Sequence, residues 1–166
     1  MLTVRATRKL LDRLGPATPG AEQASTTLLG DWYGTAWFWC PQVALLVSEV
    51  TLLPVLMPLA PAGTLLERLG PELAAVLAAH GAPAEFIDAE VRAMDPVRLA
   101  RTASRSVVGI MNEFTHLADA WRQGGPDLLT LAVRLAATPC SPLYKRHISP
   151  GRELAALVAA RPHSPR

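Results

Sequence analysis

Cysteine is scarce in this 166-residue sequence, which contains only Cys40 and Cys140. They form no CxxC motif and are too few for the disulfide framework of a small secreted domain. Long apolar runs are also missing, because the longest, 43–47 and 52–60, fall short of the roughly 18 residues that a membrane-spanning helix needs. At the N-terminus the basic residues follow the apolar ones, which is the reverse of a secretory signal. We therefore expect a reduced, cytoplasmic protein with no membrane partner.

The sequence also has only a small excess of charge of one sign. Sixteen Lys and Arg residues against fourteen Asp and Glu residues give a formal net charge of +2, which is too small and too evenly spread to indicate a nucleic-acid-binding protein. Three motifs are absent: the P-loop pattern GxxxxGKS or GxxxxGKT, the dinucleotide-binding GxGxxG after a strand, and the nucleophile-elbow GxSxG. These absences disfavour the commonest nucleotide-binding and hydrolase classes. We expect no nucleic-acid partner and no cofactor.

Apolar side chains are abundant, at 50% of the residues against 18% charged ones. A chain of this length and composition is long enough to bury a sizeable core and is typical of one folded domain. We expect a single domain over residues 1–166, with a frayed C-terminal tail at about 161–166.

Short runs rich in β-branched and aromatic residues predict a sheet. The expected strands are about 2–6, 31–39, 42–50 and 52–59. The tight connection at Cys40-Pro41-Gln42 suits a hairpin between the second and third strands. Pro54 and Pro58 lack the backbone N–H donor, so the fourth strand should lie at an edge or be bulged.

Helical spacing dominates from residue 63 onward. The clearest helix is 105–122, where apolar residues recur three and four positions apart and form one stripe. Shorter helical segments are expected at 7–15, 63–70, 71–81 (separated from the preceding one by Gly70-Pro71), 82–94, 126–137 and 151–160. The alternation at 97–100 fits a helix after Asp95-Pro96 or a further strand equally well. Segregated strands and helices favour an α+β fold with a mainly antiparallel, four-stranded sheet.

The stretch GDWYGTAWFWCP (30–41) holds five of the nine aromatic residues. Because successive strand residues point to opposite faces, large rings are expected on both faces of this strand. The rings fit a hydrophobic core, the wall of a pocket for a small apolar organic molecule, or a partner surface. If they form a pocket, the lining residues are expected to be Trp37, Trp39, Ser48, Met111 and Asn112.

Three side chains are candidates for catalysis. Cys40, at the end of the aromatic run, is a nucleophile if its pKa is lowered, and otherwise a small apolar residue. Glu49 lies in a nearly apolar strand and is either exposed or a partly desolvated general base. His116 shares a helix face with Asn112 and Glu113 and is an acid/base candidate or part of a solvated face. HExxH is absent, so we expect no metal site.

A basic segment follows near the C-terminus. In the segment 144–152, Lys145, Arg146, His147 and Arg152 are grouped around a turn and could hold a phosphate or a carboxylate. Basic loops are common in proteins without such a function, so both readings stay open.

Six segments resemble one family: RATRKLLDRL (5–14), STTLLGDWY (25–33), TLLPVLMPLAP (51–61), FIDAE (86–90), GIMNEF (109–114) and TPCSPLYKRH (138–147). The sequence resembles small uncharacterised bacterial proteins known only as a domain of unknown function. The resemblance implies a bacterial, cytoplasmic origin and no established activity. The family pattern has basic residues in place of Cys40 and Val50, asparagine in place of Ser48 and Ser104, and an acidic residue in place of Gly151. These departures fit natural drift, or an engineered variant with a pocket reshaped for an apolar ligand.

Two function classes lead. The first is a small-organic-molecule-binding protein or enzyme with an aromatic-lined pocket. The second is a protein–protein interaction module, such as one half of a toxin–antitoxin-like pair, that uses the edge strand 52–59 or the basic loop 144–147.

Overall fold

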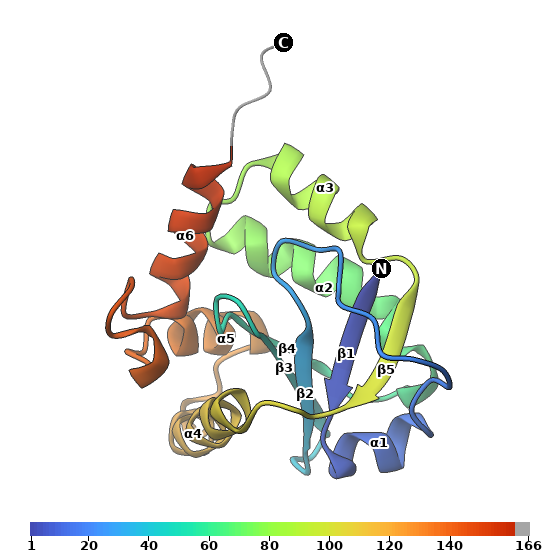
Figure 1. Ribbon diagram of the computed structural model, residues 1–166. Coiled ribbons are helices and arrows are strands. Elements are labelled where there is room, and N and C mark those ends of the chain that lie inside the picture. The colour runs from blue at the N-terminus through green and yellow to red at the C-terminus, as the bar shows by residue number, and fades with distance from the viewer. Residues whose placement is uncertain (162–166) are drawn as a thin grey trace.

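The computed structural model describes residues 1–161, which form a mixed five-stranded sheet with helices on both faces (Figure 1). The strands are β1 (Leu2–Ala6), β2 (Trp32–Trp37), β3 (Val43–Ser48), β4 (Pro54–Pro58) and β5 (Val97–Arg101). Their order across the sheet is β4-β3-β2-β1-β5. The α+β class is therefore confirmed.

The helices are α1 (Arg8–Leu14), α2 (Leu65–Ala79), α3 (Ala84–Ala93), α4 (Arg105–Trp121), α5 (Leu128–Ala136) and α6 (Pro150–Ala160). The helix expected at 105–122 is confirmed. It begins where the Ser104 hydroxyl oxygen accepts a hydrogen bond from the Val107 N–H at 3.3 Å, which satisfies one of the free donors at a helix start. No helix among residues 1–161 combines the length and the apolar character needed to cross a membrane.

The predicted four-stranded, mainly antiparallel sheet is only partly right. The hairpins β2–β3 and β3–β4 are antiparallel as expected, but β1 pairs in parallel with both β2 and β5. Residues 97–101 are the fifth strand, with Leu99 opposite Val4. A parallel pair needs a long crossover connection, and residues 7–31, which include α1, supply it between β1 and β2.

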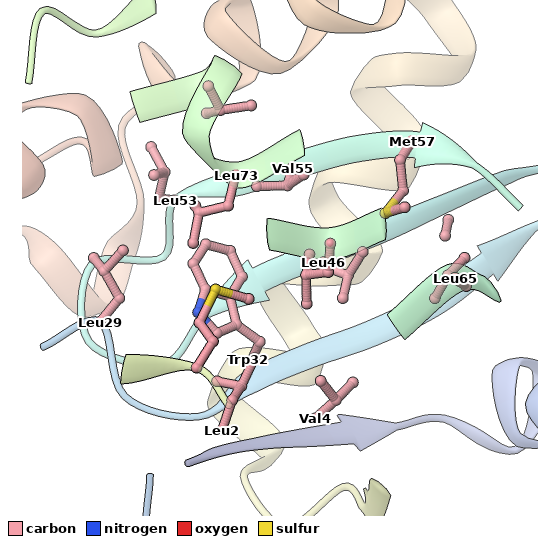
Figure 2. Packing of buried hydrophobic residues seen from close by; sticks show 14 of the residues in the cluster. Leu2, Val4, Leu29, Trp32, Leu46, Leu53, Val55, Met57, Leu65 and Leu73 are labelled. Atoms are coloured by element: carbon pink, nitrogen blue, oxygen red, sulfur yellow. The ribbon is translucent and has the colours of Figure 1, made fainter. Parts of the chain in front are cut away.

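One face of the sheet carries a core built around Trp32, which is fully buried. Figure 2 shows its ring among leucines of this core. Helix α2 covers this face with a row of leucines that includes Leu65, Leu69 and Leu73.

The other face carries a second core. Tyr33 and Trp37 of β2 and Leu45 of β3 pack there against Ile110 and Phe114 of α4. The aromatic strand therefore divides its rings between two cores, because its residues alternate between faces.

Helix α2 differs from the expected pair of helices. Gly70-Pro71 does not separate two helices, since α2 continues from Leu65 to Ala79 with Pro71 inside it. The missing Pro71 N–H removes one helical hydrogen bond. The buried residues before and after the proline, such as Leu69 and Leu73, lie in the same core, so packing keeps the two halves in one helix.

Both sheet edges are covered. β4 lies at an edge, as its prolines predicted, and α5 packs against it. The segment 16–29, which the sequence predicted to be a surface loop, has no helix or strand. Its Thr18 exchanges hydrogen bonds with Leu99 on β5, at 2.8 Å and 2.9 Å. Of the tail expected to fray, residues 162–166 lie outside the described residues.

Candidate functional site

The two expected pocket tryptophans pack against α4. Trp37 is 4% exposed, and its Nε1 donates a hydrogen bond to Thr115 Oγ1 at 2.8 Å. Trp39 Nε1 donates to Asp119 Oδ1 at 2.9 Å, and the two indole rings lie 4.8 Å apart. Met111, another expected ligand contact, is buried in the same core. These contacts join the β2–β3 hairpin to α4, and they account for the indole N–H groups.

Cys40 and Glu49, two of the three candidate catalytic residues, lie at opposite ends of β3. Cys40 is exposed in the connection before β3, whereas Glu49 follows the end of β3. Six strand residues separate them, which corresponds to roughly 20 Å. Asn112 and His116 are exposed on α4. The structure therefore gives no shared site to Cys40 and Glu49.

Glu49 is hydrogen-bonded to Asp31, the residue that precedes β2. Its Oε2 accepts a hydrogen bond from the Asp31 N–H at 3.0 Å, and its own N–H donates to the Asp31 carbonyl at 2.9 Å. Partial desolvation raises the pKa of the Glu49 carboxyl, and the nearby Asp31 charge raises it further.

Ser48 is fully buried, and its hydroxyl is fully used within the chain. Its Oγ donates to the Leu29 carbonyl at 2.7 Å and accepts from the Val50 and Thr51 N–H groups at 3.2 Å and 3.1 Å. These bonds fix the turn after β3. The hydroxyl is therefore not accessible to a ligand in this structure.

The basic loop already holds a carboxylate, that of Glu153 on α6. This side chain is 3% exposed and accepts hydrogen bonds from Arg146 Nη2 at 2.8 Å and from the His147 N–H at 3.0 Å. His147 Nδ1 lies 3.0 Å from the same carboxylate. Lys145 beside them is exposed, so the expected anion-holding residues are partly occupied by the protein's own anion.

A different place collects charged side chains, namely the carboxyl ends of β1 and β5. These two parallel strands end side by side next to α1 (Figure 1). β1 continues into α1, whose Leu10 packs in the Trp32 core, while β5 continues into α4 on the opposite face. When neighbouring parallel strands lead to opposite faces, a crevice opens between their ends, and ligands of α/β sheets bind in such crevices.

Helix α1 packs closely over a glycine in β2. A Cβ at Gly34 would lie 2.7 Å from Leu10 Cδ2, so a larger residue there would displace the Leu10 side chain. Arg8, Leu11 and Asp12 of α1 line the same groove as Arg101 at the end of β5.

The crevice is a groove of about 830 Å³, within the range usual for small-molecule sites. Its charged lining residues are Arg8, Asp12 and Arg101, and Ala6, Leu11 and Thr102 contribute further walls. Over residues 1–161, neither Arg8 nor Arg101 has a carboxylate within ion-pair distance. Two free guanidinium groups can hold a carboxylate or a phosphate through paired N–H donors.

The sequence did not point to this groove. Arg8 and Arg101 are ordinary arginines in the sequence, and they meet only because β5 pairs with β1. A usable signal existed, since each arginine lies at or just after the end of a strand-like alternation. No group of three or more His, Cys, Asp or Glu residues in the described part of the chain is placed to hold a metal ion.

Comparison with known proteins gives one positive finding. A family model described as "Domain of unknown function (DUF6933)" matches residues 3–153. This range contains β1 except for its first residue, every later element up to α5, and all residues of the groove named above. No curated protein and no solved structure matches the chain.

Proposed function

The chain belongs to the DUF6933 family of domains of unknown function, and we propose that it binds a small organic anion in the groove at the carboxyl ends of β1 and β5. The observation that carries the proposal is the pair Arg8 and Arg101, which line one groove without a carboxylate partner among residues 1–161. Together Arg8, Arg101 and Asp12 give the lining a net charge of +1, which favours an anion. The Asp12 carboxylate further favours an anion that also carries a hydrogen-bond donor.

The geometry fits this class of ligand better than it fits the apolar molecule expected from the aromatic run. Trp37 and Trp39 contact α4, whereas the groove offers open volume next to charged groups. Because the site lies where two strands end, its walls come from α1 and β5 and are held by the sheet. A preformed site of this kind loses little freedom when a ligand binds.

The test is binding of matched probes to the whole protein. Fructose 6-phosphate and citrate should bind and raise the melting temperature, while fructose should not. A ligand at a hundredfold excess over its Kd stabilises a protein by about 2.7 kcal/mol. Arg8→Gln and Arg101→Gln should each weaken binding about tenfold, the loss expected for one charge-assisted hydrogen bond.

Arg92→Gln is the matched control, since it removes the same charge from an exposed position on α3. The proposal fails if both anions leave the melting temperature unchanged, or if Arg92→Gln weakens binding as much as Arg8→Gln does.

A second function, binding of a protein partner by the basic loop, is supported by one observation. Tyr144 is 61% exposed beside Lys145, on a loop that Glu153 holds in place. An exposed aromatic ring on a rigid support is typical of a binding anchor. Quantitative co-purification with the wild-type protein and with the Tyr144→Ala, Lys145→Gln double variant tests it. A partner should be retained by the wild type and lost by the variant, and equal retention would rule this surface out.

A further inference from the structure

A second groove of about 220 Å³ adjoins the first, and both are lined by Ala17 and Arg101. The second groove lies between β5 and the segment 17–23. That segment is held across the strands by the Thr18–Leu99 hydrogen bonds and by the Thr3 hydroxyl, which donates to the Gln23 carbonyl at 2.9 Å. The two grooves thus adjoin at Ala17 and Arg101, and together they are called the depression.

Arg98 provides the charge of the second groove. Its Nη2 donates to the Pro19 carbonyl at 3.1 Å, and no carboxylate of residues 1–161 pairs with it. A Cβ at Gly20, where φ is +109°, would lie 3.5 Å from this nitrogen. The backbone of the segment thus lies close to the guanidinium. A neutral carbonyl orients the group but leaves its positive charge uncompensated.

The charges of the depression do not balance. Three arginines, Arg8, Arg98 and Arg101, line the two grooves, against two carboxylates, Asp12 and Glu22. Glu22 lies 3.2 Å from Arg5, but Arg5 is shared with Asp31 at 2.8 Å, so the lining keeps a net charge of +1. An anion entering the depression therefore meets a local excess of positive charge.

The spacing of the arginines indicates more than one anionic group. Arg98 and Arg101 lie three positions apart on β5, so their Cα atoms are separated by roughly 10 Å. Their side chains also leave the strand toward opposite faces. One carboxylate or phosphate at Arg8 and Arg101 therefore leaves Arg98 free for a second group.

We infer that the ligand is an extended organic dianion, such as a sugar bisphosphate, with one anionic group at Arg8 and Arg101 and the other at Arg98. This inference rests on the proposed function and specifies its ligand class. The body of the ligand lies along the part of the depression lined by both Ala17 and Arg101.

The test compares fructose 1,6-bisphosphate with fructose 6-phosphate, which differ by one phosphate, by calorimetry on the full chain. The bisphosphate should bind at least about tenfold more tightly, as one further charge-assisted contact implies. Arg98→Gln keeps a donor for the Pro19 carbonyl but removes the charge. It should abolish the advantage of the bisphosphate and leave fructose 6-phosphate affinity unchanged, whereas Arg8→Gln should weaken both. Arg98→Lys, which retains the charge, should keep part of the advantage.

The outcomes separate the two proposals. Equal affinity for the two phosphates, or equal loss of both in Arg98→Gln, overturns the dianion inference and leaves the anion site in place. Failure of both phosphates and citrate to bind the wild type overturns the proposed function and this inference with it. If Arg98→Gln melts at the same temperature as Arg92→Gln, the variant is folded. If it melts at a lower temperature, the affinities of Arg98→Lys for the two phosphates decide the test instead.

Discussion

Arg5 on β1 and Asp31 at the entrance to β2 form an ion pair in which Arg5 Nε donates to Asp31 Oδ2 at 2.8 Å. Both side chains are nearly buried, at 12% and 9% exposed. Arg5 Nη1 also donates to the Arg101 carbonyl at 3.2 Å. One guanidinium thus connects β1, the entrance to β2 and the last residue of β5.

The first prediction concerns this pair. Arg5→Met keeps most of the side-chain volume but leaves the Asp31 carboxylate buried without a cation, so the free energy of unfolding should fall by about 3 kcal/mol. Urea unfolding measures it. The exposed Arg92→Gln should change stability by less than about 0.5 kcal/mol. Adding Asp31→Asn to Arg5→Met should recover part of the loss, and a double variant less stable than the sum of the single ones contradicts the pairing.

Ser48 is the subject of the second prediction. Ser48→Ala removes the donor to the Leu29 carbonyl and the acceptor for the Val50 and Thr51 N–H groups; the bonds to Leu29 and Thr51 are buried and the bond to Val50 is partly buried. We expect a loss of about 2–3 kcal/mol, because each unpaired buried group costs on the order of 1–3 kcal/mol. Thermal and urea unfolding check this against Ser106→Ala, an exposed serine of α4. If both variants are equally stable, the buried bonds contribute nothing net.

The third prediction is a pH dependence. The pKa of Glu49 is raised above its ordinary value of 4.5, first by desolvation and then by the Asp31 charge. The folded chain therefore binds more protons at this group than the unfolded chain, so its contribution to stability declines as the pH rises from about the unfolded value through the folded pKa. Glu49→Gln removes this decline, and the variant should gain stability relative to the wild type over that interval.

Unfolding measured from pH 4 upward tests it. The gain is that of a surface group, below about 0.5 kcal/mol. Glu85→Gln, which removes an exposed carboxylate from α3, is the control. A wild type that gains stability relative to Glu49→Gln as the pH rises has the opposite sign and rules out the assignment.

The fourth prediction concerns the thiols. Cys40 is exposed, whereas Cys140 is fully buried and its thiol donates toward the Thr138 carbonyl at 3.4 Å. Burial, with a smaller effect of the Glu113 charge, raises the pKa of Cys140 to about 11. A disulfide reagent should therefore label one thiol in the native protein and the second only after denaturation. Cys40→Ala should abolish native labelling, and fast labelling of that variant would show that Cys140 is accessible.

Local sequence patterns predicted much of the framework correctly. The apolar stripe of 105–122 predicted α4 within one residue at its end, and the prolines at 54 and 58 predicted the edge position of β4. Hydrophobic periodicity and the missing N–H of proline both act within one element, so they can be interpreted without knowing what the element packs against. Pro71 is the exception, because packing of α2 against the sheet outweighed a local signal that indicates a helix boundary.

The same local patterns did not predict contacts between elements that are distant in the sequence. The sequence predicted that Trp37 and Trp39 lie near the long helix, but it did not predict that Thr115 and Asp119 accept hydrogen bonds from their indole nitrogens. Nothing near residue 37 in the chain specifies which side chain of a helix some 80 positions later will meet it. The hydrogen-bond partners of Ser48 and Glu153 are likewise set by how the turns and helices pack, and local sequence patterns do not show this packing.

The composition and periodicity of this chain suffice for its class, its two apolar faces and its longest helix, because burial and backbone geometry act on each segment alone. The pairing of β1 with β5 required the folded chain, and so did the placement of Arg8 and Arg101 in one groove and of Arg98 in the adjoining one. Strands with interchangeable apolar patterns can neighbour one another in several orders. The free energy that selects one order comes from all the contacts together, so the site belongs to the assembled sheet and to no single segment.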